Sequence, residues 1–534
     1  MQLRIAVSIL LSCMALARVA GQHPAFGDGP LHAHIDRLTL ERAEGKLSDR
    51  SSDGEFLRRI YLDFAGHIPS SSEARAFLAD ETPNKRELLI ERLLADDRYA
   101  ERMADLFNVM LIERRSEHEE WLKYLHESFA ANKPWDAMVR EILAPNADDE
   151  ATRGAALFYT ARLEHYGQNP PDVPGLARDV GRMFLGVDVE CAQCHDHLFI
   201  DDYKQVDYQG LYAFVGNAML RQDVKFPAVG ENPLLKKIAF KSVFDGQEQL
   251  TGPRLPGGKE IEIPEQKKGE EYLVPPDKKL RSPGVLKFSP LRTLSESLAR
   301  GDNPAFARNI VNRLWWMMMG RGLVDPLDLH HTDNPPSHPE LLDLLSQAMV
   351  SHGYDIRWLL RELALSETYQ RSSLLPDGAS QAPPPASYRT ALERPISAEQ
   401  WSTILREATG ENTTEAKTLG QWRDRFEKVF ANPPRQPELH VAPTVKAALF
   451  LSNDSVVLSW FERRDGNLVD RLCKLDSDSA VIEEAYLSVL TRFPTDEERA
   501  EMEDCLRNSS MPREKSIAML AWALAASTEF LVNH

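Results

Sequence analysis

Apolar residues recur at three- and four-residue steps over two long stretches of this chain, residues 55–143 and residues 295–534. This spacing places apolar side chains on one face of a helix, and that face must be buried against other elements. Between the two stretches, residues 222–291 alternate apolar and polar residues between Pro and Gly clusters, as short strands do. The sequence therefore predicts a mainly α protein, with two helical domains and a small antiparallel β insert between them.

The domain organisation follows from these changes in hydrophobic periodicity. A chain of 534 residues is long enough for ~3 to 4 domains of ordinary size. We expect four segments: a signal peptide at 1–21, a helical first domain at 22–221, a β-rich insert at 222–291 and a helical second domain at 292–534.

Several element boundaries carry local signals. Ser70 to Glu73, Ser337 to Glu340 and Thr495 to Glu498 each have the pattern of a capping box, and Thr82-Pro83 fits a first helical turn. Gly353 fits a left-handed C-terminal cap. In the insert, the alternating residues predict strands at Val224–Phe226, Lys237–Phe244 and Lys259–Ile263.

The first residues have the pattern of a secretion signal. Arg4 supplies a positive charge, Ile5 to Leu11 are apolar, and Ala15-Leu16-Ala17 or Val19-Ala20-Gly21 offers a cleavage site. We expect an exported protein, periplasmic or at the cell surface, with no membrane span after cleavage. A less favoured alternative is a lipoprotein anchored through Cys13, because Leu10 to Cys13 loosely resembles a lipobox.

Composition excludes some classes of function. Hydrophobic residues at 43% and charged residues at 27% are typical of a globular protein. The 63 basic and 81 acidic residues leave a net charge of −18, which repels phosphate backbones, so we expect no nucleic-acid partner. The sequence has no phosphate loop, HExxH, GxSxG or GxGxxG motif.

Cys191-Ala192-Gln193-Cys194-His195 has the pattern of a c-type haem attachment site. Two thiols three positions apart can add to the two vinyl groups of one haem, and the adjacent imidazole can bind the iron. In a shuffled sequence of this composition the expected number of such matches is on the order of 0.001. The motif predicts haem c held by Cys191, Cys194 and His195.

Two other interpretations use the same residues. Zinc or iron could bind the two thiols together with His195 or His197. Alternatively, Cys191 and Cys194 could form a short-loop disulfide, and pairing of Cys473 with Cys505 is likewise left open.

Candidates for a sixth iron ligand are weaker. His165, Met183, Met219 and His338 have suitable side chains, but core packing or helix capping explains each one as well. For His330-His331 a solvated loop is the expected structure, and for Trp315 to Met319 a buried helix.

The chain resembles the exported planctomycete-type proteins that carry a pair of cytochrome-associated domains of unknown function. The resemblance to the first domain lies in Phe56 to Asp63, Ile68-Pro69, Phe184 to Val187 and Cys191 to His197. The resemblance to the second lies in Asn303 to Arg308, Val311 to Trp315, Gly320 to Pro326, Asn334 to Asp343 and Glu529 to His534. After His197 the chain departs from the family, because Leu198-Phe199-Ile200-Asp201 replaces the typical Pro-Phe-Asp.

The resemblance implies little about activity, which is not established for the family. The Cys-His motif makes a c-type haem redox or electron-transfer protein the leading expectation. The alternative is a non-catalytic exported binding or scaffold protein associated with polysaccharide-degrading systems, with the Cys/His cluster as a zinc site or disulfide. The expected partners are accordingly a redox protein or an extracellular glycan system.

Overall fold

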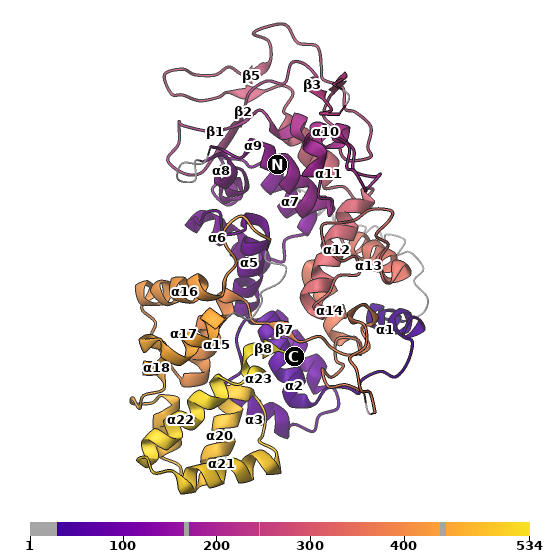
Figure 1. Cartoon of the computed structure of the whole chain (residues 1–534). Helices are drawn as coiled ribbons and strands as arrows, with labels where there is room; N and C mark the ends of the chain where they lie inside the picture. Colours follow the sequence, from indigo (N-terminus) through magenta and orange to yellow (C-terminus); the bar gives the residue numbers. More distant parts are fainter. Residues whose placement is uncertain (1–28, 165–169, 245, 377, 438–444) are drawn as a thin grey trace, which may run out of the picture.

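The computed structural model describes residues 29–534 except 165–169, 245, 377 and 438–444 (Figure 1). The expected signal peptide at 1–21 and the candidate ligand His165 lie outside the described residues. The prediction of a mainly α protein is confirmed, since the described sheets are all two-stranded and antiparallel.

The first part of the chain folds almost entirely into helices. They are α1 (Leu31–Glu41), α2 (Asp53–Phe64), α3 (Ser71–Ala79), α4 (Lys85–Leu94), α5 (Asp97–Ile112), α6 (Glu119–Ala130), α7 (Trp135–Leu143), η1 (Arg153–Ala156), α8 (Leu157–Leu163), α9 (Val173–Val180), the π-helix η2 (Gly181–Leu185), η3 (Cys191–Gln193) and α10 (Gln205–Val215).

The insert, together with the residues just before it, forms three separate hairpins instead of one sheet. Strand β1 (Ala218–Leu220) pairs with β2 (Val229–Glu231), β3 (Ile238–Lys241) with β4 (Glu248–Thr251), and β5 (Tyr272–Val274) with β6 (Val285–Leu286). The predicted strand within Lys237–Phe244 is confirmed by β3. Those predicted at Val224–Phe226 and Lys259–Ile263 are wrong: neither segment is a strand. Alternation alone does not supply the partner that a strand needs.

Helices return after the insert and continue to the C-terminus. They are α11 (Pro290–Leu298), α12 (Pro304–Met319), α13 (Pro339–Ser351), α14 (Ile356–Leu365), η4 (Pro385–Ser387), α15 (Ala398–Thr409), α16 (Ala416–Phe430), α17 (Val445–Asn453), α18 (Ser455–Trp460), α19 (Leu468–Cys473), α20 (Asp478–Leu490), α21 (Asp496–Asn508), α22 (Arg513–Ala525) and α23 (Thr528–Leu531). The last strand, β8 (Val532–Asn533), pairs with β7 (Arg394–Pro395).

Local signals place most of these helix ends. The capping boxes at Ser70 and Thr495 are both present, and Gly353 has a φ of 63°. The capping box expected at Ser337 is wrong, because α13 begins at Pro339 with His338 as its N-cap and no side-chain cap. Helix α4 begins at Lys85, two residues after the expected start at Pro83.

Two apolar cores hold the fold, and neither follows chain order. The larger core joins helices from α1 to α10 with α11 to α14. The second gathers the C-terminal helices from α15 to α23 around Leu62 and Ile68, which come from the first part of the chain. Figure 1 shows these C-terminal helices at one end of the molecule and the hairpins at the other.

Within the described ranges, no helix has both the length and the apolar character needed to cross a bilayer.

Candidate functional site

The Cys-His motif lies on a surface loop between η2 and α10. Residues Cys191–Gln193 form the single turn η3, whose Ala192 is fully buried. Cys191 and Cys194 are both exposed and carry free thiols. The buried alanine therefore anchors the turn, while both sulfur atoms are accessible from solvent.

Helix α10 holds this loop in place. The Gln205 side-chain amide donates to the carbonyls of Gln193, at 3.3 Å, and Lys241, at 3.1 Å. The backbone N–H of Gln205, at the first turn of α10, donates to Asp196 Oδ1 over 2.8 Å. An acidic side chain at a helix N-terminus satisfies an otherwise unpaired N–H and interacts favourably with the helix dipole.

The contacts of His195 fix which ring nitrogen is available. Its Nδ1 lies 2.6 Å from the carbonyl oxygen of Asp196, and a carbonyl can only accept, so Nδ1 carries the proton. In the neutral ring Nε2 therefore has a free lone pair. The ring of Phe244 lies against His195 with centroids 4.7 Å apart. A histidine whose Nδ1–H donates to a backbone carbonyl is oriented as metal-binding histidines usually are.

In His197 the Nδ1 atom accepts hydrogen bonds, whereas in His195 it donates one. The His197 Nδ1 accepts hydrogen bonds from the backbone N–H groups of Phe199, at 3.2 Å, and Ile200, at 3.0 Å. The neutral ring then carries its proton on Nε2, so neither nitrogen has a free lone pair. Its ring packs edge-on against Tyr203. His197 thus stabilises the turn that follows the motif in the chain.

The surface beside the motif is unusually apolar. Phe199 is 85% exposed and Phe244 is 68% exposed, with Leu198 and Val243 next to them also exposed. The backbone N–H of Val243 donates to the Cys194 carbonyl over 3.1 Å, which ties this segment to the motif. Large apolar side chains grouped at the surface commonly mark a binding site.

Backbone hydrogen bonds between the first and second halves of the chain hold the segment that leads into the Cys-His loop. Asp188 N–H donates to the Asp328 carbonyl over 2.9 Å, and His330 N–H donates to the Gly186 carbonyl over 3.0 Å. Gly186 has a φ of 72°, and a Cβ there would lie 2.7 Å from the His330 ring. Glycine is therefore required for this close approach.

His330 and His331 lie in a loop, as expected, but both are half-buried and not fully solvated. Tyr203 Oη donates to the His330 carbonyl over 3.2 Å, and the His331 ring packs against Tyr203. Burial, together with the charges of Arg313 and Arg308, lowers the pKa of His330 to about 3. These histidines brace the Cys-His loop from the second half of the chain.

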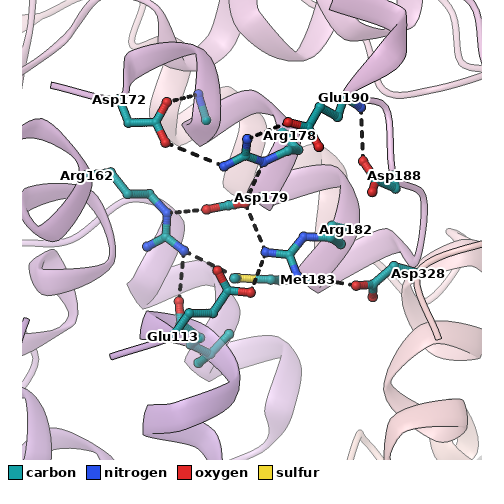
Figure 2. A network of polar contacts seen from close by, with 12 residues as sticks. Glu113, Arg162, Asp172, Arg178, Asp179, Arg182, Met183, Asp188, Glu190 and Asp328 are labelled. Atoms are coloured by element: carbon teal, nitrogen blue, oxygen red, sulfur yellow. Dashed lines mark hydrogen bonds and ion pairs between the residues drawn. The ribbon is translucent and has the colours of Figure 1, made fainter. Parts of the chain in front are cut away.

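A buried network of arginines and carboxylates lies behind this region (Figure 2). Asp179 is fully buried and interacts with Arg162 at 2.7 Å, with Arg182 at 3.1 Å and with Arg178 at 3.2 Å. Burial by itself raises the pKa of Asp179, but the charges of these arginines outweigh it and hold the pKa well below its usual range.

Arg182 extends the network across the two halves of the chain. It contacts Glu113 at 2.6 Å and Asp328 at 3.3 Å, and Asp328 also pairs with Arg313. The sequence prediction missed these residues. Charged residues inside apolar helix faces were the available signal, because a buried charge requires a partner.

The other candidates are scattered. Buried Met183 accepts a hydrogen bond from Arg162, Met219 lies in β1, and His338 packs against Tyr388. Helix α12 ends with Trp315 buried, as predicted, whereas Trp316 and Met317 are half-buried.

The described cysteines are all free thiols. Cys473 and Cys505 are free thiols, as Cys191 and Cys194 are, so the structure contains no disulfide among these four. In the part of the chain that the structure describes, no group of three or more His, Cys, Asp or Glu residues is arranged to hold a metal ion.

Comparison with known proteins agrees with this two-part construction. Residues 34–219 match the PSCyt2 family model, described as a protein of unknown function (DUF1549), and residues 292–421 match PSD1, a protein of unknown function (DUF1553). No curated protein and no solved structure matches the chain. The Cys-His loop lies in the first matched segment, and the bracing histidines lie in the second. The chain therefore carries the paired DUF1549 and DUF1553 domains of unknown function.

Proposed function

We propose that this protein is an exported single-haem redox protein, with haem c attached through Cys191 and Cys194 and with His195 as the iron ligand. One observation supports this most strongly. A single surface loop presents two exposed free thiols at the attachment spacing, followed by an imidazole whose Nε2 lone pair is free.

The surroundings of the motif suit an apolar macrocycle. Phe199 and Phe244 are exposed beside the loop, and covering them removes apolar surface from water. Bound haem supplies one-electron chemistry, while the protein contributes axial ligation and partial burial of the group.

His195 is a better ligand than His197 on chemical grounds. The Nδ1–H of His195 donates to a carbonyl, so its Nε2 can bind a metal. The Nδ1 of His197 is occupied by two backbone N–H groups. The proposal therefore assigns His195 to iron and gives His197 a positioning role.

Export is part of the same proposal. Covalent haem attachment takes place outside the cytoplasm, and residues 1–21 have the pattern of a secretion signal. The partner is then a redox protein that approaches the haem at this surface loop.

The test is expression of the full chain in a host with periplasmic haem-attachment machinery, followed by a pyridine haemochrome spectrum and elemental analysis of the same sample. We expect a Soret band that survives denaturation. The band should vanish in Cys191→Ala/Cys194→Ala and persist in the matched variant Cys473→Ala/Cys505→Ala.

Other results would overturn the proposal. Colourless protein with stoichiometric zinc, lost in Cys191→Ala/Cys194→Ala, would instead establish a metal site at the same residues. Colourless, metal-free protein in which Cys191 and Cys194 do not react with thiol reagents would establish a disulfide. The alternative function, a non-catalytic binding protein associated with polysaccharide-degrading systems, would then lead.

A further inference from the structure

A cavity of about 310 Å³ lies where the two family domains meet the C-terminal part of the chain. Its walls come from α5, η2, α12 and the segment from β7 into α15, which lie around the middle of the molecule (Figure 1). Cavities of roughly 300 Å³ are at the lower end of the range that binds small molecules. This cavity is separate from the exposed Cys-His loop, none of whose residues line it.

Most charged side chains in the lining are already neutralised. Asp63 pairs with Arg394 at 2.7 Å, and it also accepts hydrogen bonds from Tyr369 and Asn533. The other buried carboxylates of the lining also pair with arginines: Glu113 with Arg182, Asp328 with Arg182 and Arg313, and Glu399 with Arg114. Glu393, also in the lining, is exposed.

Arg102 is the exception. Its side chain lines the cavity and the residue is only 9% exposed, yet within the described ranges it makes no ion pair. In the part of the chain that the structure describes, its one side-chain hydrogen bond is to Ser397 Oγ at a long 3.3 Å, and its Nε has no acceptor. Burial lowers the pKa of Arg102 from its usual value, and it outweighs the opposing effect of the carboxylates of Asp63, Asp105 and Glu399, none of which lies within ion-pair distance.

Apart from the polar residues Ser397, Gln400 and Asn533, the rest of the lining is apolar. Leu106 and Met110 lie one and two turns along α5 from Arg102, and Met317 faces the same space from α12. Trp316 also lines the cavity, is half-buried, and has no ring contact with any residue in the described part of the chain. A cavity with apolar walls and one cation that lacks an ion pair is suited to a ligand that has an anionic group and an apolar body.

The backbone next to the cavity is strained. Helix α5 ends at Ile112, and Glu113 and Arg114 follow with φ values of 50° and 54°. Two successive non-glycine residues in the left-handed region are costly, and such strain persists where the surrounding contacts hold it, often at functional sites. Here the pairs of Glu113 with Arg182 and of Arg114 with Glu399 hold it.

We infer that this cavity binds a small organic monocarboxylate. The carboxylate pairs with the Arg102 guanidinium, whose planar fork matches a carboxylate with two parallel hydrogen bonds. The apolar body of the ligand packs against Met110 and Trp316. The inference does not depend on haem, since it rests on residues outside the Cys-His loop.

The charges of the lining favour a ligand with a single negative charge over one with two. Among the described residues that line the cavity, Arg102 is the one cation without an ion pair, and Asp63, Glu113 and Glu399 line the same cavity. A second negative charge on the ligand would lie among these carboxylates without a cation of its own. Phosphate and sulfate also lack the apolar body that the walls require.

The test is isothermal titration of the full chain, with tryptophan fluorescence as a second signal, compared between the wild type and Trp316→Phe because the chain has nine tryptophans. The probes are benzoate and hexanoate, their neutral amides, acetate as a carboxylate without an apolar body, and inorganic phosphate. We expect benzoate or hexanoate to bind at least tenfold more tightly than its amide, acetate or phosphate. Failure of both monocarboxylates to bind more tightly than about 1 mM would overturn the inference.

Variants separate binding from folding. Arg102→Met should weaken binding at least tenfold, while its melting temperature without ligand equals or exceeds that of the wild type, because an unpaired buried charge is removed. Arg102→Lys should retain part of the affinity. Arg162→Met is the structural comparison, and it should lower the melting temperature because Arg162 is fully paired. Unchanged affinity in Arg102→Met, or equal binding of benzamide and benzoate, would refute the assigned contact.

Discussion

Arg162 donates from Nε to Asp179 Oδ2 over 2.7 Å, and neither side chain is exposed to solvent at all. Asp179 also accepts a hydrogen bond from Arg115 at 3.2 Å. A carboxylate in this position is the shared counterion of several arginines. The cost of removing it is therefore the cost of leaving those arginines buried and unpaired.

Asp179→Asn should lower the free energy of unfolding by about 3–5 kcal/mol, because it keeps the shape of the side chain but removes the charge. Urea denaturation followed by circular dichroism measures this. The matched control is Glu41→Gln, which removes the exposed partner of Arg37. That change should cost at most about 1 kcal/mol. Equal effects of the two substitutions would show that the buried network does not stabilise the fold.

Two histidines with lowered pKa values make stability depend on pH. Burial lowers the pKa of His330 to about 3 and that of His338 to about 4. In the unfolded chain both rings take up a proton near pH 6.5. Between about pH 6.5 and 4 the unfolded state therefore binds more protons, so the free energy of unfolding falls as pH falls, by at most about 1.4 kcal/mol per pH unit for each histidine.

His330→Gln should make this pH dependence shallower by up to one proton. Urea midpoints measured for both proteins from pH 7 to about pH 4 give the two slopes. Carboxylates that titrate at the lower end of this range are common to both proteins, so the difference between the curves isolates His330. Parallel curves would mean that His330 is protonated equally in the folded and unfolded states.

Local chemistry made much of the fold predictable. The capping boxes at Ser70 and Thr495 lie within four residues of sequence, and each forms as the pattern requires. Leu341, Leu345 and Met349, spaced by four residues, are all buried along α13. Such features need only a helix and a side to bury, so the sequence specifies them without knowledge of the partner.

Features that depend on distant partners were not predictable. The strands expected at Val224–Phe226 and Lys259–Ile263 had the right alternation but found no neighbouring strand. Arg182 and Asp328 are 146 residues apart, and their contact appears only when the two domains are assembled. The unpaired Arg102 is recognisable only once burial and every nearby charge are known.

The Cys-His loop falls between these cases. Its spacing was visible in the sequence, whereas the different roles of its two histidines were not. Backbone groups decide those roles, the Asp196 carbonyl for His195 and the Phe199 and Ile200 amides for His197. The sequence therefore assigned haem to His195 alone, but it left both histidines as candidate ligands of zinc or iron.

The capping box at Thr495 can be tested directly. Its hydroxyl accepts from the Glu498 N–H at 3.2 Å, and the Glu498 carboxylate accepts from the Thr495 N–H at 2.8 Å. Thr495→Ala should cost about 1 kcal/mol of unfolding free energy. Glu501→Ala, at an exposed position of the same helix, should stay within about 0.5 kcal/mol of the wild type. A loss in Glu501→Ala as large as that in Thr495→Ala would rule out a specific role for the cap.

In the haem-bound protein that we propose, substitutions of the two histidines of the motif should have different effects. His195→Ala removes the imidazole with the free Nε2, so the Soret band should shift while haem stays attached through Cys191 and Cys194. His197→Ala leaves that imidazole in place but frees the two amides of Phe199 and Ile200. The spectrum should then be unchanged, while hydrogen exchange of these amides becomes faster. A Soret shift in His197→Ala with none in His195→Ala would reverse the assignment and make His197 the iron ligand.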